Sequence, residues 1–231
     1  STLMRSSAAS DVYKRQVGNY TFDTYLDYVQ QGIYLWENSP YVKNYPELYF
    51  LNYVLFHRTN DEEIKPCRTY FWKKIKDKVQ GKAMVEAALE INHWCAGEVM
   101  YQGTDMRTGS ALEIYRSGVG RCGEEAVFVV NVMRSAGIPA RPVYVPRWSH
   151  CDDNHAWVEV WCDGDWHYLG ACEPEAVLDK GWFTNAASRA MMIGSRWYDR
   201  AMPDEKVIGK DGMNRIINLL GKYAKTRWIT I

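Results

Sequence analysis

The sequence predicts an α+β fold, in which a helical first half is followed by an antiparallel sheet. From about residue 20 to residue 100, apolar side chains recur at the three- and four-residue spacing of amphipathic helices. Beyond residue 140 the pattern changes to the two-residue alternation that is typical of strands. Between these regions, Gly123–Ala136 is apolar on nearly every side, which predicts a helix buried at the centre of the domain. Helices first and strands later favour α+β over an alternating α/β order.

Each expected element has its own boundary signals. Pro, Asn and Ser separate the early helices, and Gly137 followed by Pro139 ends the central one. The alternation predicts that His155, Trp157, Glu159 and Trp161 share one face of their strand, and Asp163–Asp165 reads as a turn. The expected helices are Tyr20–Glu37, Glu47–Arg58, Pro66–Val79, Ala83–Met100, Ala111–Arg116 and Gly123–Ala136, and the expected strands are Ala140–Val145, His155–Cys162 and Trp166–Cys172.

Length and composition limit the possible functions. A chain of 231 residues can form one domain with a sizeable core. The 28 basic and 28 acidic residues cancel, which argues against a general role in binding nucleic acid or a membrane surface. No apolar run approaches the roughly 18 residues of a membrane span. The 10 Trp and 16 Tyr suit a ligand groove, but a well-packed core is the simpler explanation.

The two ends of the sequence differ from the rest. Asp11–Gln16 resembles the translation of a transposon end used in sequencing libraries, so we exclude residues 1–16 from the fold as adapter-derived. We assign residues 17–212 to the main domain and expect 213–231 to begin a truncated β-rich domain of a longer multidomain chain. With the natural N-terminus missing, the compartment stays unassigned, although an exported bacterial protein would fit.

Cys122 stands at the start of the predicted buried helix. Peptide N–H groups at a helix N-terminus favour the thiolate, the nucleophilic form of cysteine. Gly120 and Gly123 on either side allow close approach of a substrate or of another backbone segment. A buried, inert cysteine is the simpler interpretation of an isolated Cys. The position of Cys122 favours the nucleophile.

Three segments in order carry a resemblance to a known family. Cys122 opens a buried helix that ends in RSAGIPAR at Arg134–Arg141, a strand then begins HAWVEV at His155–Val160, and Glu173-Pro174 follows. This pattern resembles the transglutaminase-like superfamily, whose papain-like fold packs a nucleophile helix on an antiparallel sheet. The resemblance covers Ala111–Pro174 well and implies a thiol enzyme. It adds an expected activity to the fold class that the periodicity predicts.

The resemblance implies a catalytic base and an acid that orients it. His155 is the candidate base, and His150, in the preceding loop, is its rival among five histidines. Gly170 stands where many relatives carry Asp, so we predict Glu173 as the acid. A three-residue turn would place Glu173 directly across from His155, whereas a two-residue turn would place Cys172 there. Alternatively, a backbone carbonyl orients His155.

Other groups complete the expected site. The Cys122 N–H is one donor for a transition-state oxyanion, and the candidates for a second are Gln102, Trp94 and Tyr101. Cys151 and His155 could be two metal ligands, but a pair without further ligands is a weak signal. We therefore expect no metal and no cofactor.

The function that this pattern implies is chemistry on a peptide-like amide through a Cys122 thioester. Hydrolysis is favoured because water is always present and no amine pocket is evident. One alternative is protein crosslinking by acyl transfer to an amine. Another is a non-catalytic binding domain of a larger protein. The expected partner is a protein, peptide or peptide-like substrate, with no nucleic acid.

Overall fold

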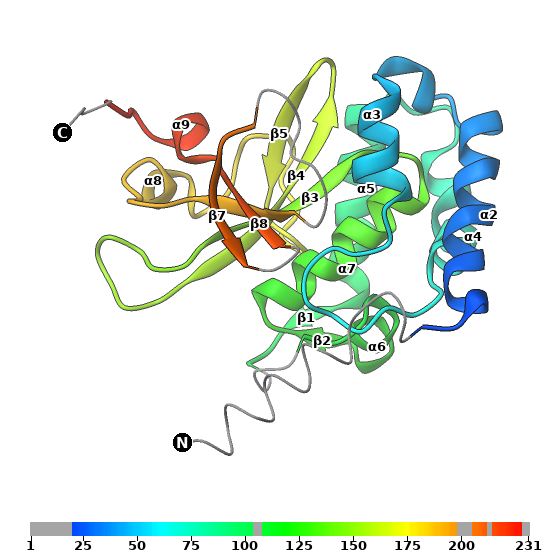
Figure 1. The fold of residues 1–231 in the computed structure, drawn as a ribbon, viewed down its shortest axis with the longest axis horizontal. Helices are drawn as coiled ribbons and strands as arrows, with labels where there is room; N and C mark the ends of the chain where they lie inside the picture. The colour runs from blue at the N-terminus through cyan, green and yellow to red at the C-terminus, as the bar shows by residue number, and fades with distance from the viewer. Residues whose placement is uncertain (1–19, 104–107, 198–204, 212–213, 228–231) are drawn as a thin grey trace.

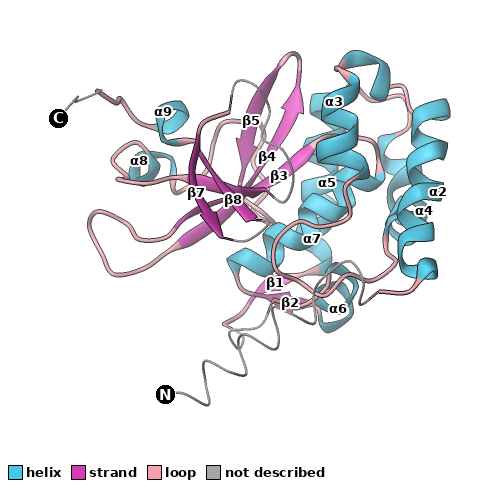
Figure 2. Cartoon of the chain, viewed as in Figure 1, coloured by secondary structure: helices cyan, strands magenta, loops and turns pink. Residues whose placement is uncertain are grey.

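The computed structural model describes residues 20–103, 108–197, 205–211 and 214–227. Figure 1 shows two regions, with the early helices packed together on one side and a twisted sheet on the other. Figure 2 shows the same division by element type. The predicted α+β class and the order of helices before sheet are confirmed. Within the described residues, no helix is both long and apolar enough to cross a membrane.

The helices begin and end close to the predicted positions. The predicted helix Glu47–Arg58 ends earlier than expected. Helix α3 continues into a single π-helical turn, η3, and the helical segment ends at Leu55. Two buried arginines explain the stop, since Arg68 and Arg134 both donate to the carbonyl of Phe56, at 3.1 and 2.9 Å. The helical elements are α2 Phe22–Asn38, η2 Val42–Asn44, α3 Glu47–Phe50, η3 Leu51–Leu55, α4 Arg68–Val79, α5 Met84–Glu98, α6 Ala111–Ser117, α7 Cys122–Ser135, α8 Thr184–Ala187 and α9 Leu220–Tyr223.

Six strands form one sheet in the order β5-β4-β3-β6-β8-β7, with antiparallel neighbours throughout. A separate parallel pair, β1 and β2, lies beside the start of α7 and has no sequence signal because each strand is two residues long. The strands are β1 Met100–Tyr101, β2 Val119–Gly120, β3 Ala140–Val145, β4 His155–Cys162, β5 Asp165–Leu169, β6 Gly194–Trp197, β7 Val207–Asp211 and β8 Asn214–Asn218.

Helix α7 is the centre of the domain, as predicted. Every residue from Glu124 to Ser135 is buried, and the helix contacts α4, α5 and α6 on one side and strands β3 and β4 on the other. A fully buried Val or Phe side chain contributes about 1.5–3 kcal/mol to folding, and α7 carries several. The burial of this helix fixes where its N-terminal residue, Cys122, lies relative to the sheet.

Strand β4 separates two apolar clusters. Val158, Val160 and Cys162 pack with α7 in the larger cluster, whereas Trp157 packs with Val143 in a smaller one. The predicted separation of Trp157 from Val158, Val160 and Cys162 is therefore confirmed, whereas Trp161 packs against the larger cluster and not with Trp157. The side chains of alternate β4 residues therefore face different surroundings.

The predicted three-residue turn between β4 and β5 is wrong. Cys162 pairs with Asp165, which leaves a two-residue turn of Asp163 and Gly164, with φ angles of 53° and 90°. Both angles are positive, as a type I′ hairpin requires, and Asp and Gly are residues that tolerate them. The return strand ends at Leu169 and does not reach Cys172.

Glu173 consequently does not lie across from His155 in a strand pair. After Leu169 the chain makes a tight turn in which Gly170 and Glu173 form an isolated antiparallel bridge and Cys172 has a φ of 57°. The strand register that motivated Glu173 as the orienting acid is therefore wrong. The position of its side chain has to be considered separately.

The C-terminal segment also differs from the expectation. Strand β8, Asn214–Asn218, was expected to begin a further domain at residue 213, but it lies between β6 and β7 in the main sheet. These residues therefore complete this domain. The two-residue alternation of a strand does not indicate which strand it pairs with, so the sequence did not predict this pairing. The prediction for residues 1–16 falls outside the described residues.

Candidate active site

Cys122 is the first residue of α7, next to the parallel pair that precedes it in the chain. The turn before it is held by Glu124, whose two carboxylate oxygens accept from the N–H groups of Gly109 and Arg121 at 3.1 and 3.2 Å. The backbone N–H of Ala156 hydrogen-bonds the Cys122 sulfur, and that of Gly123 does the same from within α7. The sulfur therefore lies against the start of β4, beside the residue that follows His155.

The Cys122 thiol is half-buried, and burial has the largest effect on its ionisation. Burial raises the pKa of Cys122, while the N–H groups of Ala156 and Gly123 lower it and the nearby Glu125 raises it. The expected stabilisation of the thiolate by peptide N–H groups is thus present, but desolvation outweighs it. In the resting protein the group is a neutral thiol, which needs a base to activate it.

His155 begins β4 and is 7% exposed. Its ring packs among aromatic side chains, with centroids 4.7 Å from Trp182 and 5.2 Å from Phe183. Burial lowers the pKa of His155 to about 4, although Asp153 opposes this. In the described part of the chain, Nε2 of His155 is the buried side-chain polar atom found without a hydrogen-bond partner. The imidazole is therefore neutral above about pH 4, with a buried nitrogen that no protein group occupies.

Glu173 is placed by the turn that follows β5. Asn92 on α5 holds this turn, since its Nδ2 donates to the carbonyl of Gly170 at 2.9 Å and its Oδ1 accepts from the N–H of Cys172 at 3.1 Å. The Glu173 carboxylate accepts from Nε1 of Trp182, at 3.0 Å to Oε1 and 3.1 Å to Oε2. Burial raises the pKa of Glu173, and this hydrogen bond lowers it.

Trp182 joins the candidate acid to the candidate base. Its indole N–H is bound to Glu173, and its ring lies 4.7 Å from the ring of His155. No hydrogen bond directly links His155 to Cys122 or to Glu173 among the described residues. The three predicted catalytic residues thus come to one end of the sheet, but this structure does not hold them in a hydrogen-bonded chain.

Of the three candidate oxyanion donors, Gln102 is the one whose backbone pairs with the segment just before Cys122. Its N–H donates to the carbonyl of Gly120 at 2.9 Å, which continues the β1–β2 pair toward the nucleophile. Tyr101 is paired one position earlier and is 69% exposed. Trp94 instead stacks on Tyr115 and packs against the core, which gives it a structural role.

Sequence reasoning missed two groups of the candidate site, Trp182 and Glu125. Trp182 carries no sequence signal beyond its type, since it lies nine positions after Glu173 in an irregular segment. Glu125 lies in the first turn of α7. It is 3% exposed, and burial raises its pKa to about 8, with Glu173 as the largest charge contribution. Its position three residues after Cys122, on the same helix face, could have identified it.

The cysteines and candidate ligands show no second centre. All six cysteines are free thiols, and Cys151 is exposed in the loop before β4. No group of three or more His, Cys, Asp or Glu side chains is placed to hold a metal ion within the described ranges. His150, the rival base, lies in the same loop, with its ring 6.0 Å from that of Trp148.

A family comparison matches this part of the chain. The model of the transglutaminase-like superfamily matches residues 73–171, which run from α4 to the turn after β5 and include Cys122 and His155. This segment belongs to the transglutaminase-like superfamily. The matched range of this transglutaminase-like domain ends two residues before Glu173, so it does not bear on the acid.

Two solved structures are similar to this chain. One is a proposed cysteine protease from Cytophaga hutchinsonii, with 18% identity, a TM-score of 0.39 and coverage of 65% of this chain. The chain spans 57% of that protein's length. The other is LapG of Legionella pneumophila, with 13% identity, a TM-score of 0.39, and coverage of 65% of this chain and 76% of LapG. A search of curated proteins found no match.

Proposed function

We propose that the protein is a cysteine-dependent enzyme that hydrolyses a peptide-like amide through a thioester on Cys122. The observation that carries the proposal is the position of the Cys122 sulfur, at the N-terminus of the buried helix and against the start of the strand that bears His155. The neutral, unpartnered imidazole of His155 is the form that a general base requires. Membership of the superfamily agrees with a thiol enzyme.

The proposed reaction has two halves. The Cys122 sulfur attacks the amide carbon as His155 Nε2 takes the thiol proton, and the resulting oxyanion is stabilised by the Cys122 N–H and the Gln102 side chain. The intermediate then expels the amine, which takes the proton from His155, and a thioester remains. Water attacks the thioester, again with proton transfer to His155. The acid is released and Cys122 recovers its proton.

For this reaction the His155 ring has to come within hydrogen-bonding reach of the sulfur. Catalytic hydrogen bonds are often longer without substrate than in the reacting complex. Glu173, held by Trp182, is the acid that orients the imidazole in this proposal. Its role rests on its place beside the ring that covers His155, and no longer on strand register.

Thiol alkylation tests the proposal. Iodoacetamide is added to the protein and to the His155→Ala variant, and modification is followed by mass spectrometry of peptides. We expect His155→Ala to slow alkylation of Cys122 at least tenfold while leaving that of Cys151 unchanged. Cys151 is a matched internal control, because it is exposed and lies four positions before His155. Equal rates at Cys122 in both proteins would exclude His155 as its base.

Product analysis separates the two acyl acceptors. With a peptide substrate that the protein cleaves, excess amine is added and the products are identified by mass spectrometry. We expect the free acid to remain the main product. A dominant amide of the added amine would identify the protein as an acyl transferase.

A further inference from the structure

Helix α2 carries an apolar seam that the domain leaves exposed. The residues of this seam follow one another at alternating spacings of four and three, as in a coiled-coil helix: Phe22, Leu26, Val29, Ile33 and Trp36. A different face of α2, with Tyr28 and Leu35, is buried in the core. The seam is therefore not the surface that packs α2 onto the domain.

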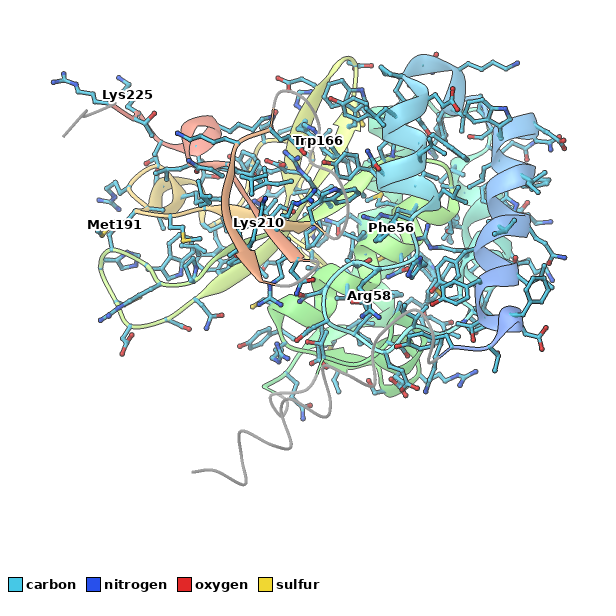
Figure 3. The ribbon with its side chains drawn as sticks, viewed as in Figure 1. Phe56, Arg58, Trp166, Met191, Lys210 and Lys225 are labelled. Carbon is cyan, nitrogen blue, oxygen red and sulfur yellow. The ribbon has the colours of Figure 1, made fainter. Side chains whose placement is uncertain are left out.

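The seam lies at the outer edge of the molecule. Figure 1 shows α2 on the side of the helical half that faces away from the sheet, and Figure 3 shows side chains projecting outward there. Phe22 is 76% exposed and Ile33 56%, and Val29 and Trp36 are exposed as well. With Leu51 of the neighbouring η3, these side chains expose roughly 300–500 Å² of apolar surface. This is the size of the largest apolar patch on a typical monomer, and such patches are often binding sites.

One edge of the seam is already covered by the domain. The Leu55 side chain of η3 lies against Gly32, and the ring of Tyr25 packs edge-on against that of His57, with centroids 5.1 Å apart. A helix that docks on the seam therefore has to approach from the other edge.

The open edge of the seam is acidic. The positions that flank the seam there recur every seven residues and are occupied by Asp23, Gln30 and Glu37. The remaining charged residue of α2, Asp27, accepts from two backbone N–H groups at the start of α4, at 2.8 and 3.2 Å. The sequence of α2 contains no Lys or Arg. The open edge therefore attracts a partner with positive charge.

We propose that the α2 seam binds a helix of a partner protein, whose own apolar face is flanked by Lys or Arg. Helices pair along apolar stripes of this spacing, and the charges beside the stripe select the partner. A second copy of this chain fits less well. Antiparallel pairing of two α2 helices would bring their acidic edges together, and parallel pairing would need the edge that η3 covers. A stable dimer also buries about 800 Å² on each partner, which is more than the seam exposes.

Two synthetic peptides test the chemistry of the partner. Each has about 21 residues, which is three heptads, with Leu at both seam positions and either Lys or Glu at the flanking positions. Both carry an N-terminal fluorescein, and binding to the protein is measured by fluorescence anisotropy at low and at high salt. We expect the Lys peptide to bind about tenfold or more tightly than the Glu peptide, and the difference to shrink at high salt.

Two pairs of variants assign the binding to the seam. Ile33→Asp places a charge in the centre of the seam, so the affinity for the Lys peptide should fall about tenfold or more. Val177→Asp is its control, because Val177 is also β-branched and 56% exposed but lies in the segment before α8. Glu37→Lys reverses a charge on the open edge, so the ratio of affinities for the Lys and Glu peptides should fall about fivefold. Asp77→Lys makes the same change in net charge at an exposed position of α4 and should change this ratio far less.

The outcomes either support the seam or overturn it. Equal affinities of the two peptides for the wild type would overturn the inference, as would an affinity for the Lys peptide that Ile33→Asp leaves unchanged. Thermal unfolding checks that the variants fold, and the Glu37→Lys comparison decides if Ile33→Asp does not. A dimer in analytical ultracentrifugation that Ile33→Asp dissociates would also overturn the inference, since the seam would then bind a second copy. Alkylation of Cys122 is a separate measurement, so none of these outcomes bears on the proposed function.

Discussion

The carboxylate of Glu173 fills the space that a side chain at Gly170 would occupy. A Cβ atom built on Gly170 would clash with Oε2 of Glu173 and would lie 2.9 Å from the Cβ of Glu173. Position 170 is where the family resemblance leads one to expect Asp. The structure thus supplies a carboxylate to that region from residue 173, three positions later in the chain. This relationship supports Glu173 as the orienting acid even though the predicted strand register is wrong.

Exchange of the two residues tests this relationship. Gly170→Ala should displace the Glu173 side chain, lowering kcat at least tenfold and stability by about 1–3 kcal/mol, the usual cost of overpacking. Gly170→Asp with Glu173→Gly moves the carboxylate to position 170, so this double variant should be more active than either single variant. Kinetics and thermal unfolding of the double variant and of the single variants Gly170→Asp and Glu173→Gly would measure the coupling between the two positions. Additive losses would mean that the two positions do not share one carboxylate site.

Removal of the nucleophile should separate activity from folding. Cys122→Ala should abolish amide hydrolysis, because no thioester can form. The fold should persist, since Cys122 is half-buried at the N-terminal end of α7 and its sulfur accepts from two backbone N–H groups whose loss does not disturb the core. Circular dichroism and thermal unfolding check the fold. Retention of full hydrolytic activity by Cys122→Ala would show that the nucleophile is another residue.

Much of the fold was predictable because its signals are local. The apolar run of α7 is stable only in the centre of a domain, and the alternation along β4 correctly separated Trp157 from Val158, Val160 and Cys162. The part of the site that could be predicted is the proximity of Cys122 to the start of β4, because a buried helix must pack on the neighbouring sheet. The family match confirmed the expected superfamily.

What the sequence did not predict depends on single turns and on tertiary contacts. One residue more or less in the Asp163–Gly164 turn shifts every pair along the hairpin, and both turn lengths suit the same residues. The early end of η3 depends on Arg134, which is 78 positions away from the Phe56 carbonyl that it binds. The contact of Trp182 with His155 joins two irregular segments and follows from no periodic pattern.

Trp182 should affect catalysis more than stability. Trp182→Phe keeps a ring over His155 but removes the N–H that binds Glu173. Because this N–H positions Glu173 in the proposed reaction, its loss should lower kcat about tenfold, which corresponds to about 1.4 kcal/mol of transition-state free energy. Because Trp182 is 64% exposed, the melting temperature of the Trp182→Phe variant should differ little from that of the wild type. Steady-state kinetics and thermal unfolding provide the two readouts.

Trp182→Ala is the comparison for the ring itself. It removes the cover over His155 as well as the N–H, so the imidazole becomes more hydrated. Since burial is the main cause of the lowered pKa of His155, that pKa should rise from about 4 toward 6.5 in this variant, and it should stay low in Trp182→Phe. An NMR titration of His155 that gives the same pKa in both variants would contradict a shielding role.

Glu125 should make both stability and activity fall on the alkaline side. Its folded pKa is raised from 4.5 to about 8, so between these values the folded state holds a proton that the unfolded state has released. The unfolded state then binds fewer protons, and stability is lost as pH rises, by at most about 1.4 kcal/mol per pH unit. Glu125→Gln does not titrate. Its melting temperature should match that of the wild type near pH 5 and exceed it increasingly toward pH 8.

The charge of Glu125 should also affect activity, so Glu125→Gln and the wild type should differ in the pH dependence of activity. Ionised Glu125 raises the pKa of Cys122, so wild-type activity should decline above about pH 8, whereas Glu125→Gln should retain it. Glu124→Gln is the matched control from the same helical turn. Glu124 holds the N–H groups of Gly109 and Arg121, so this change should lower stability already at pH 5, where Glu125→Gln should not. A constant difference in melting temperature between Glu125→Gln and the wild type from pH 5 to 9 would show that Glu125 is ionised in the folded protein throughout.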